Sequence, residues 1–165
     1  MKAFLTDISD FLFPRVCMIC GNSLLSEEKY CCTSCLISLP RTNMHLLKNS
    51  DIEKNFWGKI NIQRATSFLY YTKGGDVRKI LYELKYHANR YIGKYFGKII
   101  ANELSQAGFF ESIDLLAPVP LHKKRLQKRG YNQSEWLCMG LSEVTSIPIR
   151  TDLFHRSTQT DSQTH

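Results

Sequence analysis

The sequence lacks any hydrophobic run long enough to cross a membrane. None of its 165 residues belongs to a stretch of the roughly 18 consecutive apolar residues that a membrane helix needs. Proline and glycine are also sparse, at five and nine residues, which excludes a collagen-like or low-complexity chain. The apolar N-terminal segment carries Asp7 and Asp10 and has no small-residue cleavage site, so we expect no signal peptide and a cytoplasmic location.

Charge is distributed unevenly along the chain. The formal net charge is +7, and residues 1–60 are nearly neutral, so the excess lies in residues 61–165. Five basic side chains fall between Lys123 and Arg129 with no acid among them. A cationic cluster of this kind indicates an anionic partner such as a phosphate, a nucleotide or a nucleic acid. A solvated basic loop without a ligand is the alternative.

Five of the six cysteines lie close together in the sequence. Cys17 and Cys20 form one Cys-x2-Cys pair, and Cys32 and Cys35 form a second pair, separated from the first by eleven residues. Without a secretory signal such clusters bind metal more often than they form disulfides, and two such pairs match a structural zinc site with four thiolate ligands. Cys31 could replace Cys32 through a wider spacing, although the paired spacing favours Cys32.

The remaining pattern predicts a short helix, a small metal-binding module and a larger domain. We expect an N-terminal helix over residues 1–14, a zinc ribbon over 15–40, a connector over 41–64 and a larger domain over 65–165. Within the last range, apolar residues at helical spacing follow Asp76 and resume at Ile92 after a polar interruption, which predicts two consecutive helices or one kinked helix. A further helix is predicted after Asn132. Residues 113–120 and 147–154 read as strands on either side of this last helix. This order predicts a βαβ unit with a parallel strand pair, and hence an α/β fold.

The segment that joins the first of these strands to its helix has the features of a phosphate site. A Pro-Val-Pro turn ends the strand, a basic loop follows, and Asn132 begins a helix whose N-terminal N–H groups favour an anion. Arginine is suited to bidentate contacts with phosphate. The candidate phosphate-binding or pyrophosphate-binding residues are Pro118, Val119, Pro120, Leu121, Arg125, Arg129 and Asn132. A stiff turn and a simple helix cap, with no ligand, form the alternative interpretation.

Taken together, these motifs resemble the ComF family of competence proteins. The matching elements are the two cysteine pairs before Leu39 and Pro40, the segment Ile80–Tyr86, the Pro-Val-Pro turn with Arg-Gly-Tyr-Asn-Gln at 129–133, and the tail over 156–164. The resemblance implies a zinc ribbon followed by a type I phosphoribosyltransferase-like parallel-sheet domain over 65–165. It also implies phosphoribosyl pyrophosphate or a nucleotide as ligand, and single-stranded DNA or a DNA-uptake helicase as partner.

The family's acidic pair and Thr-Thr-Gly loop would lie after His165. The resemblance therefore implies that this domain is incomplete at its C-terminal end and that the chain is inactive as a phosphoribosyltransferase. In a longer chain Mg2+ would accompany phosphoribosyl pyrophosphate. The resemblance further implies a role in DNA uptake, natural competence or nucleotide handling. A zinc-ribbon module that binds nucleic acid without catalysis is the alternative function.

Overall fold

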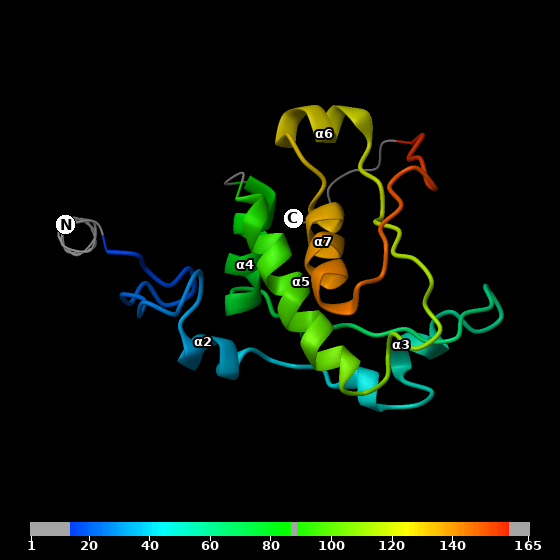
Figure 1. The fold of residues 1–165 in the computed structure, drawn as a ribbon, viewed down its shortest axis with the longest axis horizontal. Coiled ribbons are helices and arrows are strands. Elements are labelled where there is room, and N and C mark those ends of the chain that lie inside the picture. Colours follow the sequence, from blue (N-terminus) through cyan, green and yellow to red (C-terminus); the bar gives the residue numbers. More distant parts are fainter. Residues whose placement is uncertain (1–13, 87–88, 159–165) are drawn as a thin grey trace. The chain divides into compact units, whose positions relative to one another are not determined.

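The computed structural model describes residues 14–86 and 89–158 of the chain (Figure 1). The helix predicted over residues 1–14 therefore lies almost entirely outside the described residues. The chain divides into two compact units: one combines the residues up to Arg41 with Leu69–Leu81, and the other combines Thr42–Phe68 with the chain from Tyr82 onward. Each unit buries its own set of apolar side chains.

The first unit contains the cysteine-rich segment, the short helix α2 (Thr33–Ser38) and the beginning of α4 (Asp76–Tyr86). Single antiparallel bridges join Val16 to Ser23 and Arg41 to Leu69. Its buried apolar side chains come from the cysteine-rich segment and from one face of α4, and they are Cys17, Ile19, Cys31, Leu39, Val77 and Ile80.

A lysine of α4 holds the helix against the cysteine-rich segment. The ammonium of Lys79 donates a hydrogen bond of 2.6 Å to the backbone carbonyl of Ile19 and lies 3.1 Å from a carboxylate oxygen of Asp76. Asp76 stands in the first turn of α4, where a negative charge favours the helix dipole. The periodicity that predicted a helix after Asp76 is thus confirmed, and Lys79 joins this helix to the cysteine-rich segment.

The second unit is built mainly from α5 (Arg90–Ser105) and α7 (Gln133–Thr145). Its shorter elements are the 3-10 helix η1 (Met44–Leu46), α3 (Asp51–Lys54) and α6 (Lys123–Arg129). The helices predicted from apolar spacing after residue 89 and after Asn132 are both present. The basic segment that the sequence analysis treated as a loop is helix α6, capped by His122 at its start and ended by Gly130 at a positive φ of 79°.

Helices α5 and α7 pack side by side at very short range (Figure 1). A Cβ atom built on Gly97 of α5 would lie 2.9 Å from the Cα of Gly140 on α7. Only glycine at these two positions lets the helix backbones approach so closely. Glu143 of α7 also forms ion pairs with Lys94 and Lys98 of α5.

The prediction of a parallel-sheet domain is wrong. The two predicted strands do run parallel, but they share one bridge, between Leu116 and Ile149, and the residues that the structure describes contain no extended strand or sheet. The bridge uses the N–H of Leu116, which donates to Pro148, and the N–H of Arg150, which donates to Leu116, at 2.8 and 2.9 Å. A type I phosphoribosyltransferase-like sheet is thus not formed.

Two prolines explain why the parallel pairing does not extend. In a parallel ladder the next donor toward the C-terminus would be the N–H of residue 118, and the next toward the N-terminus would be that of residue 148. Both residues are proline and have no N–H group. Instead of a sheet, the segment packs into a small apolar cluster formed by Leu116, Cys138 and Ile147, with Phe110, Ile113, Leu141 and Ile149 around it.

Candidate functional site

Four cysteines of the first unit converge on one point. The sulfur atoms of Cys17, Cys20, Cys32 and Cys35 all lie within 4.8 Å of one another. The Sγ atoms of Cys20 and Cys32 are 3.8 Å apart. A tetrahedral centre with Zn–S bonds of about 2.3 Å would place its sulfur atoms about 3.8 Å apart. The donor set and its spacing therefore fit a metal ion.

Local backbone structure presents these sulfur atoms to one another. The first cysteine pair is followed by Gly21, which has a φ of 77°, a conformation that favours glycine. The N–H of Gly21 closes the turn by donating to the carbonyl of Cys17 at 2.9 Å. The N–H of Cys32 points at the sulfur of Cys17 at 3.3 Å. At the second pair the carboxylate of Glu28 accepts hydrogen bonds from the N–H groups of Leu25 and Thr33, at 2.9 and 2.6 Å, and so fixes the start of α2.

The thiol of Cys17 is more acidic than an ordinary cysteine thiol, because its pKa is lowered. Burial by itself raises the pKa of Cys17, but hydrogen bonds from the backbone N–H groups of Cys20, Cys32 and Ile19 outweigh it and lower this pKa to about 6. Burial and the neighbouring sulfurs raise the pKa of Cys35 above its usual value. A thiolate thus forms readily at Cys17, while a thiolate at Cys35 needs a positive charge beside it, as a metal ion would supply.

Cys31 lies next to the cluster in sequence but is not part of it. Its side chain is fully buried, with 0% exposure, and it is absent from the group of four converging sulfurs. Burial, followed by charge on Cys17, Cys32 and Cys20, raises the pKa of Cys31 to about 12. Its thiol therefore stays protonated and packs as a small apolar group.

The residues predicted to bind phosphate are only partly brought together. A cavity of about 550 Å3 in the second unit is lined by Pro118, Pro120, Leu121 and Asn132. Val119 points outward with 66% exposure, and Arg125 and Arg129 lie on α6 outside this lining. The turn and the start of α7 thus line one cavity, while Arg125 and Arg129 lie outside its lining.

Asn132 holds the two sides of this turn together. Its side-chain oxygen accepts a hydrogen bond of 3.1 Å from the N–H of Ser134 and so caps α7. Its amide nitrogen donates to the carbonyl of Val119 at 3.0 Å. Asn132 therefore connects the turn to the helix at the cavity wall, because both its side-chain oxygen and its side-chain nitrogen form hydrogen bonds within the protein.

The cavity is completed by residues that sequence reasoning did not assign to it. Lys123 of α6 brings a positive charge, Arg156 brings another from the segment after the parallel bridge, and Glu135 of α7 brings a negative one. Phe154 and His155 lie on the same side as Arg156. The closeness of Lys123 to the Pro-Val-Pro turn in the sequence is the one signal that could have placed it at this cavity. The lining residues from the segment 151–157 reach the cavity only through the tertiary fold, so the sequence could not have indicated them.

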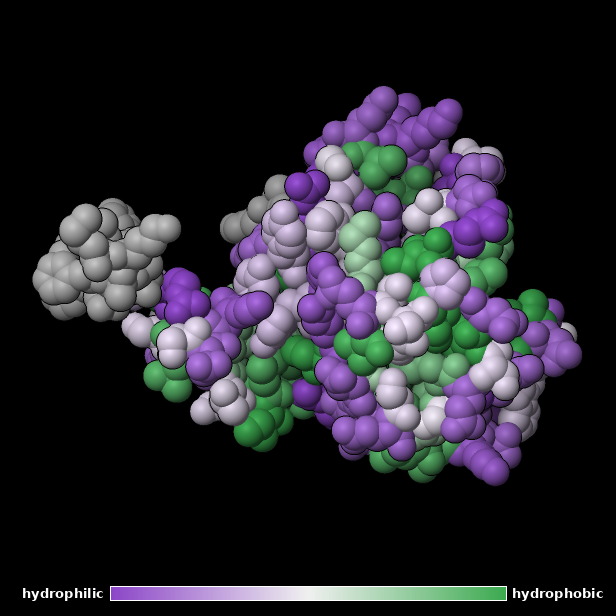
Figure 2. Space-filling view, in the orientation of Figure 1, coloured by the Kyte–Doolittle hydropathy of each residue, from purple (hydrophilic) through white to green (hydrophobic). Residues whose placement is uncertain are grey.

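Hydrophilic side chains cover the end of the second unit formed by α6, which lies at the top of Figure 2. Lys123, Lys124 and Lys128 are all exposed there. Helix α6 therefore presents positive charge to solvent beside the cavity.

Comparison of the chain with protein-family models, curated proteins and solved structures gives no match. Among the described residues, none of the helices combines the length and the apolar character needed to cross a membrane.

Proposed function

We propose that this chain is a ComF-like, zinc-stabilised protein of the cytoplasm that binds a phosphorylated ligand. The ligand would be a nucleotide or a phosphoribosyl compound, in keeping with a role in nucleotide handling or DNA uptake. The observation that carries the proposal is the cavity beside the Pro-Val-Pro turn. Four of the residues predicted from the sequence line it, and so do Lys123 and Arg156. The proposal includes no phosphoribosyltransferase fold and no transferase reaction.

The cavity supports binding of a phosphate group by its charge and its shape. Lys123 and Arg156 supply two positive charges against one negative charge from Glu135. Lysine and arginine bind phosphate through charge-assisted hydrogen bonds, which are stronger than neutral ones. The rings of Phe154 and of the prolines offer apolar surface for the rest of the ligand.

Calorimetric titration with nucleotides and with phosphoribosyl pyrophosphate, with and without Mg2+, tests this site. Replacing Lys123 with glutamine removes a charge from the cavity wall and is expected to weaken binding about tenfold, the loss of one charge-assisted hydrogen bond. Lys124→Gln is the matched control, because Lys124 is exposed on the same helix but does not line the cavity. An equal loss in both variants, or no binding to the native chain, would contradict the proposal.

The metal of the four-cysteine cluster is proposed to be zinc in a structural role. The fit of four sulfur ligands to a tetrahedral centre supports this, and four thiolates leave no open position for catalysis. When bound, the ion would neutralise the thiolates and join the two cysteine pairs. A reducing compartment such as the cytoplasm would keep these thiols available.

Two adjacent cysteines allow a sharp test of the metal site. Cys32→Ala removes one of the converging sulfurs, whereas Cys31→Ala removes a buried thiol outside the cluster. Native mass spectrometry is expected to find one zinc ion per native chain and per Cys31→Ala chain, and a loss of bound zinc in Cys32→Ala. Zinc retained by Cys32→Ala but lost by Cys31→Ala would show that the wrong thiol was assigned.

Nucleic acid is a second candidate ligand, favoured by the exposed face of α6. This helix has five basic residues and no acid in seven positions. A nucleic-acid backbone would contact several of these lysines together, so binding of a single strand would weaken steeply with salt, with a log–log slope of about −0.7 for each phosphate contacted. It would also be weakened equally by Lys123→Gln and Lys124→Gln, which separates it from a ligand held in the cavity.

A further inference from the structure

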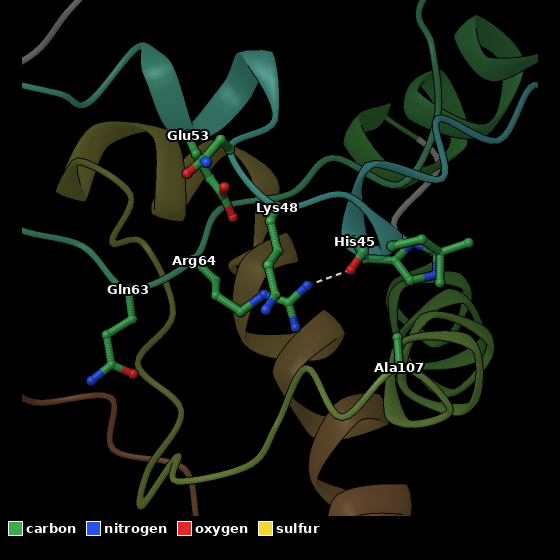
Figure 3. A pocket seen from close by; sticks show the side chains of 8 residues that line it. His45, Lys48, Glu53, Gln63, Arg64 and Ala107 are labelled. Carbon is green, nitrogen blue, oxygen red and sulfur yellow. Dashed lines mark hydrogen bonds between the residues drawn. The ribbon is translucent and has the colours of Figure 1, made fainter.

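A second cavity lies in the same unit, away from the Pro-Val-Pro turn. It has a volume of about 600 Å3 and opens between η1, α3, the segment around Arg64 and Ala107, which follows α5 (Figure 3). Its lining includes the charged side chains of Lys48, Glu53 and Arg64 and the amides of Asn49 and Gln63. Most of this region belongs to the connector predicted over residues 41–64, for which the sequence indicated no function.

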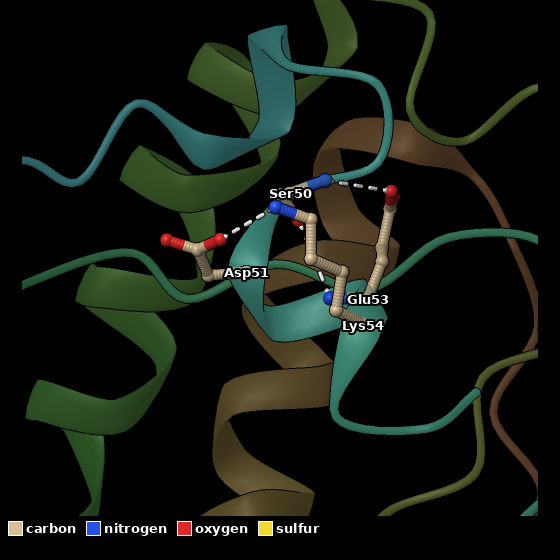
Figure 4. A network of polar contacts seen from close by, with 4 residues as sticks. All are labelled: Ser50, Asp51, Glu53 and Lys54. Carbon is tan, nitrogen blue, oxygen red and sulfur yellow. Dashed lines mark hydrogen bonds and ion pairs between the residues drawn. The ribbon is translucent and has the colours of Figure 1, made fainter.

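Hydrogen bonds at α3 make one wall of this cavity rigid. The N–H of Glu53 donates to the hydroxyl of Ser50 at 3.4 Å, and the N–H of Ser50 donates back to the Glu53 carboxylate at 3.1 Å (Figure 4). The other carboxylate oxygen of Glu53 accepts from the N–H of Ala65 at 3.3 Å. Glu53 is 8% exposed, so its carboxylate is held in the wall, where two backbone N–H groups donate to it.

Arg64 is fixed in orientation on the opposite side. Its Nη2 donates to the backbone carbonyl of His45, and its guanidinium lies over the ring of Phe109, 4.7 Å from the ring centre. A guanidinium carries five donor hydrogens, and the carbonyl of His45 uses only one of the two terminal nitrogens. The planar group is therefore positioned in advance, with further donors along its edge in the cavity.

Lys48 brings a second positive charge to the same place. In Figure 3 the ends of the Lys48 and Arg64 side chains extend toward the same part of the cavity, and both residues line it. The described lining thus holds two positive charges against the single negative charge of Glu53. Two like charges in a shared cavity repel each other, and an anion bound between them relieves that repulsion.

We propose that this cavity binds the phosphate group of a small molecule. Arg64 provides the planar, forked donor set that matches two phosphate oxygens, and Lys48 provides a mobile point charge for a third. The amides of Asn49 and Gln63 are further donors in the lining. The inference is independent of the proposed function, because this cavity shares no residue with the one at the Pro-Val-Pro turn.

Titration of the native chain with inorganic phosphate, followed by heteronuclear NMR at constant ionic strength, tests the site. The side-chain N–H signal of Arg64 and the backbone signals of Asn49 and Ala107 are expected to shift together. Acetate is expected to bind at least about tenfold more weakly, because it has fewer oxygens and less charge. Unchanged signals at these three residues, or equal binding of acetate and phosphate, would overturn the proposal.

A pair of lysine variants separates local contact from general charge. Lys48→Gln is expected to weaken phosphate binding about tenfold, the loss of one charge-assisted contact. Lys54→Gln removes the same charge from α3, where Lys54 pairs with Asp51 at 2.9 Å and does not line the cavity, so binding should stay within about twofold (Figure 4). Equal weakening in the two variants would refute a specific site.

Discussion

Replacing Gly97 with alanine tests the close approach of α5 and α7. The new Cβ would lie 2.3 Å from the backbone oxygen of Leu137 and 2.9 Å from the Cα of Gly140. Both neighbouring atoms belong to backbone, so no change of rotamer can relieve the overlap. The shorter distance falls about 1 Å below ordinary van der Waals contact, which begins at 3.4 Å. The two helices must therefore separate or tilt.

The size of the effect follows from two opposing terms. Overpacking a buried contact lowers the free energy of unfolding by about 1–3 kcal/mol. We expect a loss at the upper end of this range, because both atoms that the new Cβ meets belong to the backbone. Alanine in a helix gains about 1 kcal/mol over glycine. We therefore expect Gly97→Ala to lower the free energy of unfolding by about 2 kcal/mol. Gly140→Ala should behave alike, since its Cβ would lie 2.1 Å from the carbonyl oxygen of Lys94.

Gly93 supplies the matched control on the same helix. Its Cβ would meet a side-chain carbon of Trp136 at 3.1 Å and backbone atoms only at 3.5 Å, so we expect Gly93→Ala to stay within about 1 kcal/mol of the native chain. Urea unfolding followed by tryptophan fluorescence measures all three variants, because Trp57 and Trp136 both belong to the second unit. A Gly97→Ala chain as stable as the native one, or less affected than Gly93→Ala, would refute the reasoning.

Three further perturbations have defined outcomes. Removing the metal with a chelator is expected to unfold the cysteine-rich segment, because metal binding and folding are coupled there; unchanged NMR signals of the segment after complete metal removal would contradict this. Tyr131→Phe removes the hydroxyl that donates to the carbonyl of Leu84 and should lower the free energy of unfolding in urea by about 1 kcal/mol; an unchanged free energy of unfolding would show that this hydrogen bond contributes nothing. Hydrogen bonds and charge from Lys94 and Lys98 hold the pKa of Glu143 below 4.5, so its contribution is present above that pH and is lost as the pH falls through the lower folded-state value. Glu143→Gln should flatten the decline of stability below about pH 4.5, and an identical decline in both chains would argue against the ion pairs.

Local signals in the sequence predicted the main helices and the grouping of the cysteines. Apolar spacing predicted α4, α5 and α7, and Asn132 was correctly identified as the cap of α7. Paired Cys-x2-Cys spacing identified the same four sulfurs that the structure brings together, because such spacing depends on short turns that the local sequence determines. Residues 123–129 are mostly basic and show no apolar periodicity, so the sequence did not predict helix α6. Its caps, His122 and Gly130, are the signal that could have revealed it.

Features that depend on distant contacts were not predictable in the same way. The parallel pair was expected to belong to a sheet, but the missing N–H groups of Pro118 and Pro148 limit it to one bridge. The second cavity was missed because Lys48 and Arg64 lie sixteen positions apart and meet only through the tertiary fold. The Ser-x-x-Glu pattern beginning at Ser50 was the one local sign of ordered structure in that region.

The two prolines beside the Leu116–Ile149 bridge also affect how the chain behaves among other copies of itself. Extended segments with unpaired backbone groups can recruit another polypeptide edge to edge, which is a common start of aggregation. Pro118 and Pro148 remove donors only from the two edges that face each other across the bridge, so a segment of a second copy that replaced either bridge partner would find the ladder interrupted at the same positions. The prolines that prevent a sheet within the chain thus also limit the pairing that could form if two copies exchanged these segments.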